Sequence, residues 1–188
     1  MENWLSLTLT TEPALEPVTQ AEAKLYIKQP VSITTDDLLI DSLIKTARKL
    51  AEDYCNRAFI DQTWTMVLND TPNIIEIPKG YLDSITSINI IDEDGVATLQ
   101  AATMYQVEDG EAAIVFLETG ESWTSTTRLL GQMRVVFKSG YGSLVTDIPE
   151  GIKTGIKQLI LQLYEDRGNT ELTSLTRSVL QPYKLYNI

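Results

Sequence analysis

The side chains of this chain that are suited to chemistry are its acids, its lysines and tyrosines, and a single cysteine, Cys55. There is no histidine, which excludes a Ser-His or Cys-His nucleophile pair, imidazole metal ligands and a protonation switch near neutral pH. Cys55 lies on the apolar edge of an expected helix. We interpret it as a buried small hydrophobic residue, because no histidine is present to activate the thiol.

The acid-rich run Asp92-Glu93-Asp94-Gly95 has the composition of a calcium-binding turn. An EF-hand loop places a bidentate glutamate six residues after its glycine, but this chain has Ala101 at that position. We therefore interpret the run as a solvated hairpin turn. The sequence predicts no metal site and no bound cofactor.

The run Ser139-Gly140-Tyr141-Gly142 follows an expected strand, but it lacks the spacing of a phosphate-binding loop, and no helix starts directly behind the glycines. Turn geometry and close packing account for these glycines better.

A pair of carboxylates for glycoside hydrolysis stays open among 26 acids, although nothing in the sequence places two of them across a cleft. No catalytic residue is assigned, and the chain is predicted not to be an enzyme.

The amino-acid composition narrows the possible functions of the protein further. The chain has 188 residues, 43% of them hydrophobic, with 15 basic against 26 acidic side chains and a net charge of -11. This excess of acid argues against tight nucleic-acid binding, which needs cations to neutralise phosphates. No apolar run reaches the roughly 18 residues of a membrane span, and the first residues lack a signal-peptide pattern. We expect a soluble protein, made inside the cell, that does not enter a membrane.

Three helices are predicted by caps and apolar spacing. The first begins at Thr19, with Glu22 at the capping-box position, and runs to about Lys28. The second has Thr34 or Thr35 as its N-cap and ends near Asn56, and the third starts at an Asp147 to Glu150 capping signature. Their apolar stripes predict a common core of Ile40, Leu43, Ile44, Ala47, Leu50, Tyr54, Ile152, Ile156, Leu159, Ile160 and Leu163.

Between these helices, several short alternating strands with acid-glycine turns predict an antiparallel β lobe. The fold class is therefore α+β, with a helical core of three or four helices and an inserted β lobe. We expect an N-terminal arm over residues 1–17, a helical core from residues 18–60 and 147–179, the β lobe over residues 61–146, and a C-terminal arm over residues 180–188.

Both arms carry aromatic residues. Trp4 lies in the first arm, and the last arm contains Leu180, Pro182, Tyr183, Leu185, Tyr186 and Ile188. Side chains of this kind on an arm are either docked onto the parent domain or reserved for a partner, and both possibilities stay open.

Several runs, taken in order, resemble one protein family. They are Pro17-Val18-Thr19 with Glu22-Ala23-Lys24, the stretch from Ala51-Glu52-Asp53-Tyr54-Cys55-Asn56 to Trp64, Ile75-Glu76-Ile77-Pro78, Ile85-Thr86-Ser87-Ile88, the strand at Tyr105, Lys138-Ser139-Gly140-Tyr141-Gly142, Ile148-Pro149-Glu150, Tyr164-Glu165-Asp166-Arg167-Gly168 and Leu180-Gln181-Pro182-Tyr183. Their order and spacing resemble the head-tail connector, or head completion adaptor, proteins of tailed bacteriophages and prophages. A glycine is common in that family where Asn56 stands here.

The resemblance implies a structural protein of the virion neck, made in the bacterial host cytoplasm. It implies a twelvefold ring of this chain below the portal protein, which extends the DNA channel and receives a head-closure, stopper or tail protein. The C-terminal arm from Leu180 would dock on the portal, so deletion of residues 180–188 is expected to abolish portal binding and leave the fold intact. Alternatives are another neck or tail-completion protein, or a carboxylate-based hydrolase.

A neck ring also gives the net charge of -11 a role. DNA would pass through the channel transiently and without specific binding, and acid lining the lumen would repel its phosphates. Asp and Glu are therefore expected to face the lumen more often than Lys and Arg.

Overall fold

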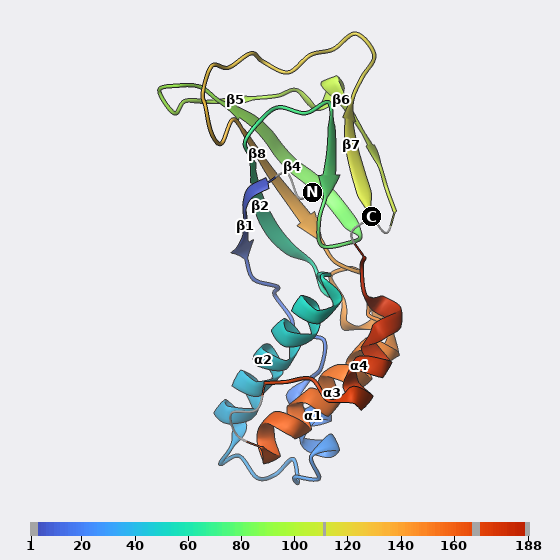
Figure 1. The fold of residues 1–188 in the computed structure, drawn as a ribbon. Coiled ribbons are helices and arrows are strands. Elements are labelled where there is room, and N and C mark those ends of the chain that lie inside the picture. Colours follow the sequence, from blue (N-terminus) through green and yellow to red (C-terminus); the bar gives the residue numbers. More distant parts are fainter. Residues whose placement is uncertain (1–3, 111, 167–169, 187–188) are drawn as a thin grey trace. The chain divides into compact units, whose positions relative to one another are not determined.

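The computed structural model describes residues 4–110, 112–166 and 170–186. By its internal packing the chain divides into two compact units (Figure 1). The β unit consists of Met1–Pro13 and Asp61–Gly140, and the helical unit consists of Ala14–Ile60 and Tyr141–Ile188. Helices and antiparallel sheets are segregated along the chain, which confirms the α+β class. Within the described ranges, no helix is long and apolar enough to cross a membrane.

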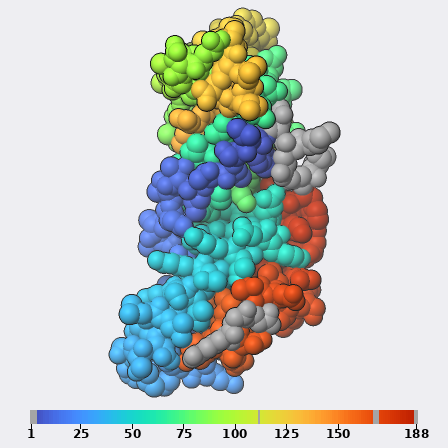
Figure 2. Space-filling view, turned by 60° about the vertical axis from the view of Figure 1, so that its left-hand side comes forward, coloured from blue at the N-terminus to red at the C-terminus, as the bar shows by residue number. Residues whose placement is uncertain are grey.

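The β unit contains two antiparallel sheets. The larger has the strand order β1 (Trp4–Thr11), β2 (Gln62–Leu68), β8 (Met133–Ser139), β4 (Leu82–Ile91) and β5 (Ala97–Leu99). The smaller has the order β3 (Ile74–Ile77), β7 (Ala113–Leu117) and β6 (Tyr105–Glu108), with the 3-10 turn η1 (Ala102–Met104) before β6. In Figure 2 the β4–β5 turn and the residues near 130 lie together on the surface of this unit.

The segment that begins at Trp4 forms part of the larger sheet. Trp4–Thr11 forms the edge strand β1, in which Leu7 lies opposite Met66 of β2. The prediction of an arm over residues 1–17 did not anticipate this pairing. Polar and apolar residues alternate along this segment, which is the pattern of a strand, and β2 offers the free edge that pairs with it.

The β core is apolar and continuous. It is built from alternate residues of the strands, with Trp123 closing one side. The indole N–H of Trp123 donates to the carbonyl of Pro72 at 2.8 Å, so the polar atom of this side chain is satisfied. The buried members are Met66, Leu68, Ile75, Ile77, Leu82, Ile88, Ile90, Ala113, Val115, Trp123, Met133, Val135 and Phe137.

The described part of the helical unit contains α1 (Gln20–Tyr26), α2 (Asp37–Cys55), α3 (Glu150–Glu165) and α4 (Ser174–Leu180), with the 3-10 turns η2 (Val145–Asp147) and η3 (Gln181–Tyr183). The capping box of α1 is present, since the Glu22 N–H donates to the Thr19 hydroxyl and the Thr19 N–H donates to the Glu22 carboxylate. Asn56 ends α2 in the left-handed conformation, with φ of 50°. Asparagine tolerates this conformation better than most residues, which explains its place where the connector family often has glycine.

Two predicted caps are wrong. The N-cap of α2 is Asp36 rather than Thr34 or Thr35, and its carboxylate accepts bonds from other side chains instead of capping the helix. Likewise, the N-cap of α3 is Pro149 and not Asp147. The Asp147 carboxylate instead accepts the Leu144 N–H at 3.0 Å within the preceding turn.

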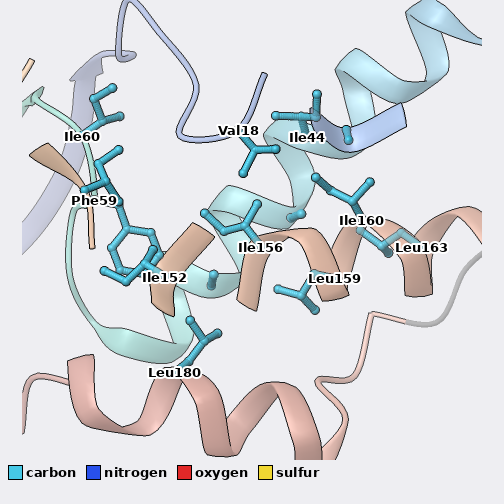
Figure 3. Packing of buried hydrophobic residues seen from close by; sticks show 14 of the residues in the cluster. Val18, Ile44, Phe59, Ile60, Ile152, Ile156, Leu159, Ile160, Leu163 and Leu180 are labelled. Carbon is cyan, nitrogen blue, oxygen red and sulfur yellow. The ribbon is translucent and has the colours of Figure 1, made fainter. Parts of the chain in front are cut away.

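The core of the helical unit is centred on α3, which contacts α1, α2 and α4 (Figure 3). In this view α4 lies on one side of α3, and α1 and α2 lie on the other. Of the residues predicted to pack here, Leu43, Leu50 and Tyr54 are partly buried and pack against the cluster. The others are buried members of it: Ile40, Ile44, Ala47, Ile152, Ile156, Leu159, Ile160 and Leu163.

Candidate assembly surface

The C-terminal segment is folded onto the helical unit. Leu180, at the end of α4, is fully buried, and its side chain fills a notch in α3 that exists because residue 155 is glycine. A Cβ on Gly155 would lie 2.6 Å from Leu180 Cδ2. One turn earlier in α3, a Cβ on Gly151 would lie 2.3 Å from the Tyr183 hydroxyl oxygen. Glycines spaced by four residues thus form a groove that receives α4 and η3.

The same segment is tied to the end of α2. The Tyr54 hydroxyl donates to the Gln181 side-chain oxygen at 2.6 Å, and the Leu185 N–H donates to the Cys55 carbonyl at 2.8 Å. The Lys184 ammonium lies 4.7 Å from the centre of the Tyr54 ring, within cation–π distance. We call residues 181–186 the C-terminal strap.

Of the two possibilities left open for the C-terminal arm, these contacts show docking onto the parent unit as far as residue 185. Leu180 belongs to the core, Tyr183 and Leu185 are partly buried, and Pro182 and Tyr186 are exposed. Ile188 lies outside the described residues. Deletion of residues 180–188 would therefore remove core packing as well as the strap. The sequence alone could not decide between docking and a partner, because an apolar residue at a helix end has the same pattern in both cases.

Cys55 is buried beneath the strap, and its thiol donates to the Leu180 carbonyl at 3.7 Å. Burial raises the pKa of the Cys55 thiol to about 12, against an ordinary value of 9.0, although Arg57 and Lys184 oppose the shift. The thiol is therefore protonated at neutral pH and is a poor nucleophile. Its position agrees with the interpretation of Cys55 as a small hydrophobic residue.

A buried ion-pair network holds the segment that follows α2. Arg48 is 1% exposed, and its Nε donates to Glu16 at 2.8 Å while Nη1 donates to Glu52 at 2.8 Å. The other carboxylate oxygen of Glu52 accepts the Phe59 N–H at 2.9 Å. This network fixes the chain as it leaves α2. Sequence reasoning missed it, although a charged residue within the apolar stripe of a helix is a signal of such pairing.

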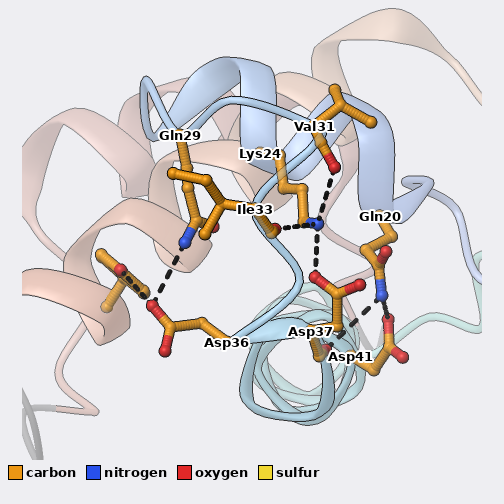
Figure 4. Close-up of polar contacts among 9 residues, drawn as sticks. Gln20, Lys24, Gln29, Val31, Ile33, Asp36, Asp37 and Asp41 are labelled. Atoms are coloured by element: carbon orange, nitrogen blue, oxygen red, sulfur yellow. Dashed lines mark hydrogen bonds and ion pairs between the residues drawn. The ribbon is translucent and has the colours of Figure 1, made fainter.

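A second buried cation organises the connection between α1 and α2 (Figure 4). Lys24 is 1% exposed, and its ammonium donates to the carbonyls of Ile33 at 2.8 Å and Val31 at 3.4 Å. It also forms an ion pair with Asp37. The buried charge is thus paired and hydrogen-bonded, as burial requires, and it fixes the conformation of the connecting segment.

This segment displays apolar side chains to solvent. Between residues 25 and 39, six large apolar side chains are exposed, and large exposed apolar areas often mark a surface that binds a partner. We call this surface the α1–α2 apolar patch. Its members, with exposed fractions between 37% and 87%, are Leu25, Tyr26, Val31, Ile33, Leu38 and Leu39.

The other motifs singled out from the sequence have structural roles. Asp92 closes a hairpin turn by accepting the Val96 N–H at 2.8 Å, and Gly95 has a positive φ of 83°. A Cβ on Gly142 would meet the Asp147 carboxylate at 2.3 Å, so this glycine is required by close approach. Among the described residues, no group of three or more His, Cys, Asp and Glu side chains is arranged to hold a metal ion.

Comparison with known proteins gives a match in structure and none in sequence. No family model matches the chain, and no curated protein sequence matches it. A chain from the neck of an empty gene transfer agent (GTA) particle, computed with sixfold symmetry, matches with a TM-score of 0.84 at 15% identity. The match covers 98% of this chain and 97% of that chain.

The chain has the fold of a GTA particle protein. A chain of the native GTA virion matches with a TM-score of 0.81, and one from the native neck computed with twelvefold symmetry matches with 0.73, both at 16% identity. Each match covers 98% of this chain and 97% of the other. The neck is the part of a particle to which the sequence resemblance pointed, so the fold implied by that resemblance is confirmed.

Proposed function

We propose that this chain is a structural head-tail connector of a phage, prophage or phage-like particle. It assembles as a twelvefold ring below the portal protein, extends the DNA channel and links it to a head-closure, stopper or tail protein. The observation that carries the proposal is the fold match over nearly the whole length of chains from GTA necks.

The helical unit supplies the features that a ring needs. Neighbours in a closed ring contact each other head to tail, so each subunit needs two different faces. The helices α1 and α2, which carry Leu25, Tyr26, Leu38 and Leu39 of the α1–α2 apolar patch, lie on one side of α3, and α4 lies on the other (Figure 3). Leu175 of α4 is 63% exposed. We infer that the patch contacts the α4 side of the next subunit.

We infer that the portal contact lies at the end of the C-terminal strap and does not involve the whole predicted arm of residues 180–188. Tyr186 is 59% exposed, and it follows Leu185, whose backbone is the last described anchor to α2. An exposed aromatic side chain beside a docked segment is a suitable contact for a partner. We infer that Tyr186 contacts the portal, while Leu180 and Tyr183 hold the base of the strap.

Electron microscopy of the purified chain mixed with its purified portal tests the proposal. A twelvefold ring bound below the portal is expected, and the absence of any ring or portal complex would overturn it. Leu38→Asp, at an 87% exposed position of the patch, is expected to prevent ring closure without unfolding the subunit. Ile74→Asp, at a 63% exposed position of the β unit, is the matched control that should still assemble.

The same material distinguishes the related role of a tail-completion protein. A tail-completion protein would be captured by tail components and not by the portal. Binding of the purified chain to immobilised portal, compared with binding to immobilised tail protein, separates the two roles directly.

A further inference from the structure

The acid-rich turn that follows β4 is packed against a second loop that carries exposed leucines. The Arg128 guanidinium donates from Nη1 to the Asp92 carbonyl at 3.2 Å and from Nε to the Leu130 carbonyl at 2.7 Å. The Thr126 hydroxyl donates to the Ile91 carbonyl at 2.9 Å, and the Thr127 hydroxyl contacts the Glu93 carboxylate. The two segments are thus joined by several hydrogen bonds.

The loop is also anchored at both ends. Upstream, the Thr124 N–H and hydroxyl both bond to the buried Gln100 side chain, at 3.2 and 3.1 Å. Downstream, the Ile91 N–H donates to the Gln132 carbonyl at 2.8 Å, which ties the end of the loop to β4. The exposed leucines are therefore held in place by a fixed backbone and do not lie on a free loop.

These segments together display an apolar centre bordered by acid. Leu129 is 90% exposed, Leu130 is 60% exposed and Val96 is 58% exposed, which is unfavourable for large apolar side chains unless a partner covers them. Beside them, three consecutive acids are exposed, Asp92, Glu93 and Asp94. We call the six residues the leucine tip, and Figure 2 shows its two segments side by side.

The charge around the leucine tip restricts what can bind there. The leucine tip itself contains three acids, and the cation that joins its two segments, Arg128, donates from its guanidinium to backbone carbonyls. Two copies of this tip facing each other would repel, as would DNA or an anionic membrane. A complementary surface must combine an apolar pocket with surrounding Lys and Arg side chains.

We propose that the leucine tip docks into an apolar pocket with a basic rim on a different protein of the particle. Leu129 and Leu130 enter the pocket, and Asp94 with its neighbours pairs with the rim. A few well-buried apolar side chains provide most of the binding energy in such interfaces, while rim charges set the association rate and its salt dependence. The choice of partner rests on the proposed neck role, whereas the pocket chemistry follows from the tip alone.

The test measures binding of the full chain to two probes, the purified portal protein and the purified head-closure or tail protein of the same particle. One probe is expected to bind, and Leu129→Ser is expected to weaken this binding at least about tenfold. Asp94→Lys should weaken it as well and should reduce its salt dependence. The matched controls are Ile74→Ser and Glu108→Lys, which change exposed residues of the smaller sheet and should bind as the unaltered chain does.

Three outcomes would overturn the proposal: neither probe binds, the tip variants bind as tightly as the controls, or the tip variants change only self-association. The last outcome would assign the tip to a second copy of this chain. Electron microscopy of the same variants separates this proposal from the neck role. Suppose that rings form on the portal and that the tip variants bind each probe as the unaltered chain does. The tip proposal then fails, and the connector function stands.

Discussion

The Leu180 side chain occupies the space that a side chain at Gly155 would need. An ideal Cβ at position 155 would approach Leu180 Cδ2 to 2.6 Å and Cγ to 2.8 Å. This contact joins the end of α4 to the middle of α3. It makes the first residue of the predicted C-terminal arm part of the core, and the position of the C-terminal strap depends on it.

Gly155→Ala is therefore expected to destabilise the helical unit. Overpacking costs about 1–3 kcal/mol, and the better helix propensity of alanine offsets at most about 1 kcal/mol of this. Urea unfolding followed by circular dichroism measures the change. Gly110→Ala is the control, since nothing lies within 4 Å of its added Cβ, and an equal loss in both variants would contradict the close contact.

Gly151→Ala is expected to displace Tyr183, because the added Cβ would lie 2.3 Å from the tyrosine hydroxyl oxygen. The backbone amide of Leu185 should then exchange hydrogen faster, since its bond to the Cys55 carbonyl depends on the docked strap. In a Tyr183→Ala background the same glycine substitution should have little further effect. Additive losses of stability in the double variant would argue against the contact.

The Cys55 thiol is expected to make stability fall at alkaline pH. Its pKa is raised to about 12 in the folded chain against 9.0 ordinarily, so the folded state keeps a proton that the unfolded state loses. The stabilisation is complete below pH 9 and disappears as the pH rises toward 12, with a slope of at most about 1.4 kcal/mol per pH unit. Unfolding free energies of the chain and of Cys55→Ala across this range measure the effect. Parallel curves would contradict it.

Lys24→Met is expected to release the segment between α1 and α2. The substitution leaves two backbone carbonyls and the Asp37 carboxylate without their shared donor, at a cost of about 2 kcal/mol. Hydrogen exchange should accelerate in residues 27–36 more than elsewhere. Lys28→Met changes an exposed lysine in the same segment and should leave exchange unaltered.

The lumen of the proposed ring is expected to be lined with acid. The chain has a net charge of -11, and a channel that passes DNA without retaining it should repel phosphate. A ring structure resolved to side chains gives the count of lumen-facing Asp and Glu against Lys and Arg. A basic lumen would refute this role for the charge.

Local features of the fold were predictable from the sequence. The capping box of Thr19 and Glu22, the apolar stripe of α2 and the strand Ile74–Ile77 all follow from residues close together in the chain. The pairing of β1 with β2 and the notch at Gly155 were not, because each depends on a partner that is distant in sequence. The leucine tip was not predictable either, because its two segments are far apart in the sequence and no motif in either one indicates the other.

The pairing of the first strand has a consequence for biosynthesis. When β1 leaves the ribosome, β2 has not been made, since both α1 and α2 are translated between them. The remaining strands of the larger sheet come later still, with β8 last. The helical unit is likewise incomplete until α3 and α4 appear. A nascent chain that stalls before β8 would therefore expose unpaired strand edges, and we expect such chains to need chaperones that complete chains do not.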